Sequence, residues 1–430
     1  MSGEIIATRL SNGLTVHLKE IHTAPIISSW MWYRVGSRYE LPGLTGLSHW
    51  VEHMQFKGTP TFPSGKLDKL ISREGGIWNA FTYLDWTTYF ETMPKDKIRL
   101  AFDLEADRMN NSRFDKHEVE SERTVILSER EGNENEPLFK LSEAIQKAAF
   151  RKHPYRIEVI GEKTDLNRIQ RKDLFHHYHS YYTPSNAVLA VAGDFDANRM
   201  LTNIQKVFDR LPSRPAPAFA SKRESFLDKE KRLSVNGPGG TTYIQIAYRA
   251  PAGGDPDFMP YTVLDSLLAG PTGLNMFGGG SISNKTSRLY RALVNKELAI
   301  GVGGGIQATI DPYLYEITIT VNPRHSPDTV LVAFDREIDL LLEQRVSQKE
   351  VDRAIKQARA LFAYGSESIT NQAFWLGYSE MFAHYDWFTS YLNRLATVTI
   401  EDVLTICQKY LRQNTRVVGF YLPGSGKVSR

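Results

Sequence analysis

The sequence predicts an α+β fold made of two homologous domains, each a largely antiparallel sheet packed with helices. Three observations predict it. The chain has 430 residues, more than one hydrophobic core usually holds. A proline-rich stretch at residues 211–220, L-P-S-R-P-A-P-A-F-A, divides it nearly in half. The halves also share a pattern: K-D-L followed by Y-Y-T-P-S-N-A-V-L-A-V-A-G, within residues 172–193, returns loosely as E-D-V followed by Y-L-R-Q-N-T-R-V-V-G, within residues 401–419.

Each copy of this repeat is typical of an amphipathic helix, a turn and a nearly continuous apolar strand. That order indicates helices packed on a sheet in both halves. We therefore predict an N-terminal domain at residues 1–212, a linker at residues 213–232 and a C-terminal domain at residues 233–430. The charged residues 221–232 extend the linker, and strand-like residues resume at position 233.

Composition excludes several classes of protein. The formal charge of +3 is small, and no dense lysine and arginine run interleaves with aromatic residues, so nucleic acid is not an expected partner. Cys407 is the only cysteine, which excludes an intrachain disulfide and a thiolate metal cluster. No apolar run approaches the roughly 20 residues of a membrane span. We expect a cytoplasmic protein with no membrane partner; removal of a targeting segment is the alternative.

Two histidines and a glutamate carry the clearest chemical signal. The sequence L-S-H-W-V-E-H, residues 47–53, has the spacing of the H-x-x-E-H zinc peptidase motif. If residues 44–56 are helical, His49 and His53 lie one turn apart on one face, which Glu52 shares. Zinc held by imidazoles activates a water, and an unligated glutamate can take its proton. The alternative is a solvated helix face on which these residues meet by chance.

The flanking sequence G-L-S-H-W-V-E-H-M-Q-F-K-G-T, residues 46–59, resembles the active-site helix of the pitrilysin and insulysin family. In that family the third zinc ligand is a glutamate on a second helix downstream, which residues 118–129 resemble. The resemblance implies that Glu129 is this ligand and that Glu122 supports catalysis without binding the metal. Spacing alone does not choose among the glutamates of this acidic run, which are Glu118, Glu120, Glu122, Glu129 and Glu131.

Residues 75–92, G-G-I-W-N-A-F-T-Y-L-D-W-T-T-Y-F-E-T, are rich in aromatic and β-branched residues and predict two strands. In the family that the chain resembles, an edge strand with the sequence N-A-x-T pairs with the substrate backbone. The residues that match it are Asn79, Ala80, Phe81 and Thr82. The alternative is an ordinary hairpin whose aromatic side chains fill a core.

The second half of the chain has no zinc motif at the corresponding place. Active relatives usually carry an arginine and a tyrosine seven residues apart after an S-R-L segment. Here S-R-L stands at residues 287–289, but Leu293 and Ile300 occupy the positions of the pair. The resemblance therefore implies one half of a clamshell chamber and the zinc-bearing subunit of a heterodimer, like that of mitochondrial processing peptidase, whose partner carries the arginine–tyrosine pair. A homodimer or a weak peptidase without the pair is the alternative.

Other motifs receive lesser roles. The loop around Gly278–Gly280 resembles the glycine-rich substrate loop of a noncatalytic processing subunit, although glycine runs are common in surface loops. The side chains of His176, His177 and His179 point in different directions from one helix, so we do not expect them to share an ion without other ligands and assign them to packing or surface. His153, in an H-P-Y turn, is expected to be structural.

Together these features predict a zinc-dependent metalloendopeptidase that hydrolyses peptides or unfolded segments. Its metal would be zinc held by His49, His53 and Glu129, with Glu52 activating the water and then protonating the amine. The alternative function is a noncatalytic structural or assembly subunit, because the family also contains zinc-free members.

Overall fold

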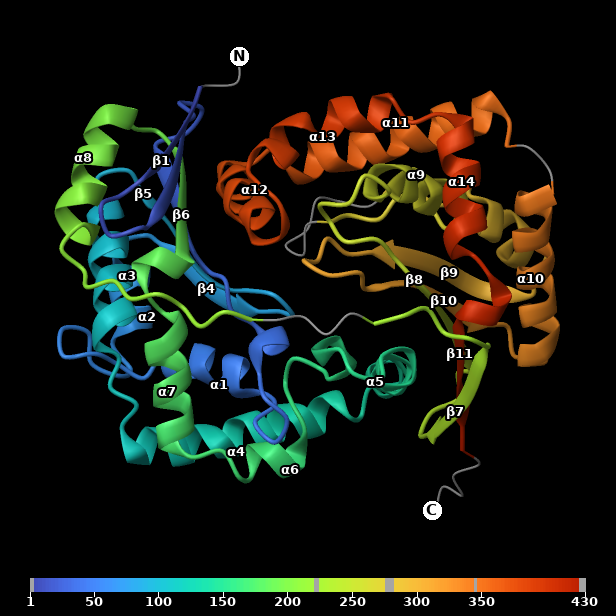
Figure 1. Cartoon of the computed structure of the whole chain (residues 1–430), viewed down its shortest axis with the longest axis horizontal. Coiled ribbons are helices and arrows are strands. Elements are labelled where there is room, and N and C mark those ends of the chain that lie inside the picture. Colours follow the sequence, from blue (N-terminus) through green and yellow to red (C-terminus); the bar gives the residue numbers. More distant parts are fainter. Residues whose placement is uncertain (1–3, 220–223, 275–281, 344–345, 425–430) are drawn as a thin grey trace. The chain divides into compact units, whose positions relative to one another are not determined.

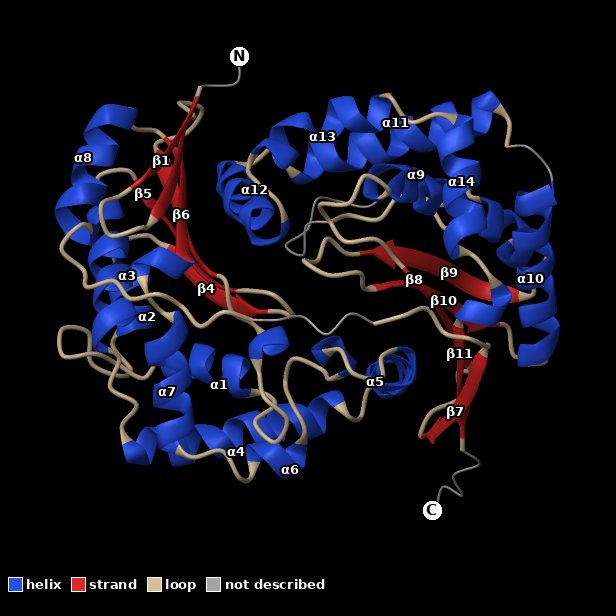
Figure 2. Cartoon of the chain, viewed as in Figure 1, coloured by secondary structure: helices blue, strands red, loops and turns tan. Residues whose placement is uncertain are grey.

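The computed structural model describes residues 4–219, 224–274, 282–343 and 346–424. They form two compact units, each built on one sheet (Figure 1). Unit 1 comprises Met1–Arg130, Ile157–Ala220 and Glu367–Phe388, and unit 2 comprises Glu131–Arg156, Ser221–Ser366 and Thr389–Arg430. The predicted α+β class is confirmed, since helices accompany both sheets (Figure 2).

The sheet of unit 1 has six strands in the order β1-β2-β6-β3-β5-β4. Only β2 and β6 pair in parallel; the other neighbours are antiparallel, as predicted. The strands are β1 (Ile5–Arg9), β2 (Thr15–Glu20), β3 (Ile26–Tyr33), β4 (Ile77–Thr82), β5 (Thr87–Pro94) and β6 (Ala187–Gly193). The two strands predicted within residues 75–92 are β4 and β5, and β4 is the last strand at its edge.

Helices cover both faces of this sheet. One face carries α3 (Ile98–Asn111) and α8 (Ala197–Phe208), while α12 (Ile369–Phe382) lies against β3 and β6 on the other (Figure 1). The close approach of α12 depends on Gly377, because a Cβ at this position would collide with the Trp32 indole of β3. The other helices of this unit are α1 (Leu47–Met54), α2 (Leu67–Arg73), α4 (Lys116–Asn133, to Arg130), α6 (Lys163–Leu166) and α7 (Arg171–Tyr181).

The sheet of unit 2 has five strands in the order β7-β11-β8-β10-β9. They are β7 (Lys231–Gly237), β8 (Tyr243–Arg249), β9 (Ala299–Ile306), β10 (Leu314–Val321) and β11 (Val417–Pro423), and only β7 and β11 pair in parallel. The helices are α5 (Pro137–Ala149), α9 (Phe258–Leu268), α10 (Pro327–Glu343), α11 (Gln348–Gly365), α13 (Asp386–Ala396) and α14 (Ile400–Tyr410). Helix α5 contacts β7, β8 and β11.

Both copies of the repeat found in the sequence have the same order of helix, turn and strand. Helix α7, a 3-10 turn (Pro184–Asn186) and β6 correspond to α14, a 3-10 turn (Gln413–Thr415) and β11. Both helices begin with a reciprocal capping box, formed by Gln170 with Asp173 and by Thr399 with Asp402. Both strands lie inside their sheets next to a parallel neighbour.

The compact units differ from the continuous ranges predicted above. The main division of the chain falls after Ala220, inside the predicted linker, but α12 belongs to unit 1 and α5 to unit 2. The last residues of the predicted linker are also strand, because β7 begins at Lys231. An amphipathic pattern shows that a helix has an apolar face, but it does not show which sheet that face covers. Within the described residues, no helix combines the length and apolar character that a membrane span requires.

Candidate metal centre

Helix α1 carries the histidine motif. As predicted, its apolar residues lie on one side and the histidines on the other. Its apolar side chains, Leu47, Trp50, Val51 and Met54, are buried, with exposed fractions of 5% or less. His49 and His53 lie together on the polar side, with ring centroids 4.5 Å apart. The helix is shorter than the predicted range 44–56, because Gly46 adopts a left-handed conformation (φ 87°) immediately before it.

A buried carboxylate fixes the start of α1. Glu40 accepts hydrogen bonds from the backbone N–H groups of Gly46 and Ser48, each at 2.7 Å, and so satisfies donors that a helix leaves unpaired at its N-terminus. Burial raises the pKa of Glu40 to about 7, although both hydrogen bonds oppose that rise. The Ser48 hydroxyl lies 3.1 Å from His177 Nε2 on α7.

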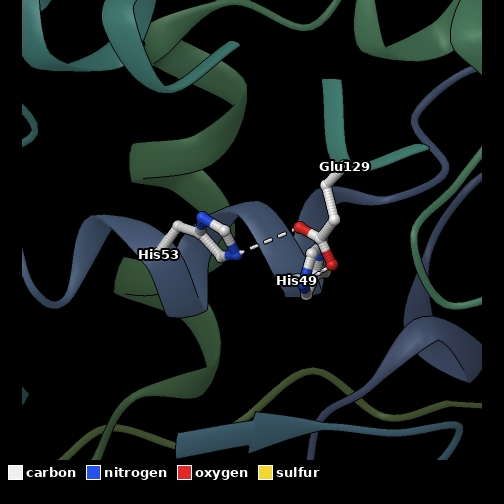
Figure 3. Close-up of side chains that lie close together, drawn as sticks. All are labelled: His49, His53 and Glu129. Atoms are coloured by element: carbon white, nitrogen blue, oxygen red, sulfur yellow. Dashed lines mark ion pairs between the residues drawn. The ribbon is translucent and has the colours of Figure 1, made fainter. Parts of the chain in front are cut away.

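Helix α4 brings the third candidate ligand to the histidines. One nitrogen of His49, one of His53 and one carboxylate oxygen of Glu129 all lie within 4.8 Å of one another. Glu129 faces both rings (Figure 3), with Oε1 3.8 Å from His49 Nε2 and Oε2 3.7 Å from His53 Nε2. The Arg123 guanidinium lies over the Trp50 ring at 4.7 Å, which adds a contact between α4 and α1.

Glu122, two turns before Glu129, contacts a histidine. Its Oε1 lies 2.8 Å from His53 Nδ1, and its Oε2 lies 2.5 Å from Lys57 Nζ. Burial opposes ionisation of Glu122, but these two partners outweigh burial and lower its pKa. A donor proton on Nδ1 leaves the Nε2 lone pair of His53 directed toward Glu129 and the candidate metal position, an arrangement common among metal-binding histidines.

Glu52 is the buried carboxylate beside these ligands, with 7% of its surface exposed. The Thr82 hydroxyl of β4 donates a hydrogen bond of 2.6 Å to its Oε2. Burial raises the pKa of Glu52 to about 7, although the Thr82 bond and the nearby His53 lower it. A carboxyl group whose pKa lies near neutrality suits general base and general acid chemistry.

The donor set fits zinc. Two imidazoles and one carboxylate around one point are a known ligand combination for catalytic zinc, with a fourth position left for water or substrate. Burial, and then the neighbouring His53, lower the pKa of His49 to about 3, so His49 is neutral and able to bind a cation. Its buried Nδ1 has no hydrogen-bond partner among the described residues, whereas its Nε2 faces Glu129. No other group in the described part of the chain meets the same geometric test.

Strand β4 offers an open edge beside Glu52. It pairs only with β5 in the described sheet. The Tyr83 N–H donates to the Trp86 carbonyl at 2.8 Å, so the alternation of an antiparallel pair turns the N–H of Ala80 toward the open edge. There Asn79 Oδ1 accepts from this N–H at 2.9 Å. Asn79, Ala80, Phe81 and Thr82 therefore all lie on an edge strand, as the family resemblance implied.

Other residues named from the sequence lie outside this cluster. His177 is buried, while His176 and His179 are exposed, consistent with packing and surface roles. His153 is buried, and its Nε2 lies 3.0 Å from Asp311. In unit 2, Leu293 is fully buried and Ile300 is 62% exposed on β9. The loop around Gly278–Gly280 lies outside the described residues.

Sequence reasoning missed the contacts that three residues make with the site. Glu40 precedes α1 in a segment without a recognisable motif, and nothing in the sequence indicates its capping role. Thr82 was expected only on a substrate strand, yet its hydroxyl contacts Glu52. Lys57 lies four residues after His53, a spacing that places both side chains on one side of a continuing helical turn and could have been noticed.

Comparison with known families agrees with this geometry. Residues 15–163 match the family described as insulinase (peptidase family M16), and residues 168–358 match the peptidase M16 inactive domain. The chain belongs to the M16 peptidases, the family that includes pitrilysin and insulysin. The match to an inactive domain lies mostly in the half in which the sequence lacks a zinc motif.

Individual relatives include zinc proteases and processing peptidase subunits. Zinc protease PqqE of Helicobacter pylori is 26% identical over 96% of this chain and 92% of its own length. A probable mitochondrial-processing peptidase subunit beta of Arabidopsis thaliana is 29% identical over 66% of this chain and 54% of its own length. A crystal structure of a protease from Helicobacter pylori matches with a TM-score of 0.90 at 25% identity, covering 98% of this chain and all of the other.

Proposed function

We propose that this protein is a zinc-dependent metalloendopeptidase that hydrolyses peptides or unfolded segments. The observation that carries the proposal is the meeting of His49, His53 and Glu129, from two helices, beside the buried carboxylate of Glu52. The zinc protease relatives support it, because M16 membership makes peptide hydrolysis the expected chemistry of such a site.

The chain's own residues have distinct tasks in this proposal. His49, His53 and Glu129 would hold the ion. When bound, zinc would lower the pKa of a water molecule and polarise the scissile carbonyl. Glu52 takes the proton of the attacking water and delivers it to the leaving amine, while the Thr82 hydroxyl keeps its carboxylate oriented. The open edge of β4 binds the substrate backbone as an added strand.

We further propose that a second subunit completes the enzyme. Leu293 and Ile300 stand where active relatives usually carry an arginine and a tyrosine, and neither side chain can donate a hydrogen bond to a substrate. A homologous partner that carries this pair would supply those donors, as in a processing peptidase heterodimer. The processing peptidase beta subunits among the relatives support this reading.

Cleavage of a quenched fluorogenic peptide tests the function. Zinc-loaded protein should cleave the peptide, alone or with a co-purified partner, and Glu52→Gln should abolish turnover while retaining zinc, measured by elemental analysis. His49→Ala should lose both. Full activity of Glu52→Gln, purified free of other proteases, would refute the mechanism. A wild-type protein that binds no zinc and stays silent with its partner would indicate a noncatalytic assembly subunit instead.

A further inference from the structure

Lys57 lies three residues after the end of α1 and contacts the site through the carboxylate of Glu122. Its backbone N–H donates to the Met54 carbonyl at 3.0 Å, so the residue continues the helical path of α1 by one turn. Its Nζ lies 2.5 Å from Glu122 Oε2, while the other oxygen of Glu122 lies 2.8 Å from His53 Nδ1. Each oxygen of Glu122 therefore has its own partner, and both partners come from the α1 segment.

We propose that Lys57 is a positioning residue for the metal centre, acting through Glu122 on His53. This inference rests on the proposed zinc function. The terminal torsion of a glutamate has a broad energy minimum, so a carboxylate held on one side alone can rotate. The ammonium group of Lys57 fixes Oε2, which leaves Oε1 directed at the Nδ1–H of His53. Nε2 of that ring then faces the metal position.

The two histidines differ in how they are held. His49 Nδ1 has no hydrogen-bond partner among the described residues, so no hydrogen bond at Nδ1 orients that ring. His53 is held by a polar contact, and 20% of its side chain is exposed against 14% for His49. A less enclosed ring depends more on its hydrogen bond, which makes His53 the ligand that loss of Lys57 would loosen.

The contact between Lys57 and Glu122 also affects Glu129, the third candidate ligand. Glu122 and Glu129 are seven residues apart on α4, close to two full turns, and therefore share one face of that helix. The contact of Lys57 with Glu122 ties this face of α4 to α1. Because Glu122 is only 4% exposed, removing Lys57 leaves one oxygen of a buried carboxylate without its cation. Glu122 would then reorient, and the geometry of the ligand set would relax with it.

The test compares Lys57→Met and Lys57→Arg with wild type, and uses Lys97→Met as a matched control. Lys97 pairs with Glu74 at 3.1 Å on the surface, so its loss removes an ion pair elsewhere. We expect Lys57→Met to weaken zinc binding several-fold in a chelator competition, less than the roughly 10- to 100-fold that follows loss of a group bonded directly to a metal ligand, because Lys57 contacts His53 only through Glu122. Lys57→Arg, which keeps the charge, should restore most of it. Lys97→Met should bind zinc like wild type.

A second measurement needs neither zinc nor activity. Long-range nitrogen–proton NMR correlations of the histidine rings in the metal-free protein, recorded at an alkaline pH where the rings are neutral, report which nitrogen carries the proton. Wild type should show His53 protonated at Nδ1, and Lys57→Met should show a mixture of tautomers. An unchanged tautomer, together with zinc affinity within about twofold of wild type, would overturn the inference.

A double-mutant cycle separates positioning from a general loss of stability. If Lys57 acts through Glu122, Lys57→Met should cause little further loss of zinc affinity in a Glu122→Gln background. Fully additive losses would overturn the inference, even if Lys57→Met lowers the melting temperature. Zinc binding that depends on Lys57 without any peptide cleavage would refute the proposed peptidase function and leave this inference standing.

Discussion

Replacing Thr82 by valine removes one donor from Glu52 and changes little else. The Thr82 hydroxyl donates to Glu52 Oε2 at 2.6 Å and lies 3.4 Å from the Thr87 hydroxyl of the neighbouring strand. Valine keeps the branched shape that suits a strand but cannot donate a hydrogen bond. The position of β4 is preserved by its pairing with β5, so the variant tests the hydroxyl itself.

The expected loss of activity follows from the type of hydrogen bond that the substitution removes. A hydrogen bond to a charged group contributes about 1.5–3 kcal/mol. Since about 1.4 kcal/mol corresponds to a factor of ten in rate, Thr82→Val should lower kcat/KM by roughly 10- to 150-fold. The loss should appear mainly in kcat, because the hydroxyl contacts the proposed general base, Glu52, rather than the bound peptide.

The pH profile should change as well. Donation from Thr82 stabilises ionised Glu52 and lowers its pKa, against the larger effect of burial. Removing the donor therefore raises the pKa of Glu52 further. Because the base must be ionised to accept a proton, the acidic limb of kcat/KM moves to higher pH, and the loss of activity is greatest in acid.

Peptide cleavage measured from acidic to alkaline pH tests the predicted role of the Thr82 hydroxyl. Thr82→Ser keeps the hydroxyl and should retain most of the activity. Thr88→Val is the matched control, since the Thr88 hydroxyl donates to the Met31 carbonyl at 3.0 Å, away from Glu52. If Thr82→Val and Thr82→Ser show the same kcat and the same acidic limb, the role assigned to this hydroxyl is wrong.

Two further predictions concern the scaffold. Gly377→Ala should lower the free energy of unfolding by about 1–3 kcal/mol in urea titrations, because the added methyl group meets the Trp32 indole, whereas Gly240→Ala, with open space around it, should have little effect. Glu40→Gln should destabilise the protein more near pH 5 than near pH 8. The pKa of Glu40 is raised to about 7 in the folded state, so its contribution to stability is fully present below its ordinary pKa and declines as the pH rises through about 7. An equal effect of Glu40→Gln at both pH values would contradict this assignment.

Much of the candidate site could be predicted because its members are local in sequence. His49, Glu52 and His53 share a helix face by spacing alone, and that geometry holds wherever the helix is placed. The two strands within residues 75–92 were also predictable from their strand-forming residues, whereas the edge position of the first was implied by the family resemblance. The spacing of the α4 glutamates did not single out Glu129; the family resemblance did, and the structure brings this residue to both histidines.

Contacts between elements distant in sequence could not be predicted in the same way. The bond of Thr82 to Glu52, the cap of α1 by Glu40 and the contact of Lys57 with Glu122 each join separate segments. The type of each residue shows which hydrogen bonds its side chain can donate or accept. The partner of each bond depends on which surfaces of the chain meet after folding.

The sequence by itself determined the two-part α+β architecture, the helix–turn–strand repeat and the helix face shared by His49, Glu52 and His53. These properties follow from periodicity and side-chain chemistry, which act over a few residues. The tertiary structure decided that α12 packs on the sheet of unit 1, that Glu129 faces the histidines and that Glu52 is buried enough to have a pKa of about 7. Burial and long-range contacts depend on the complete packing of the chain, so no local pattern contains them.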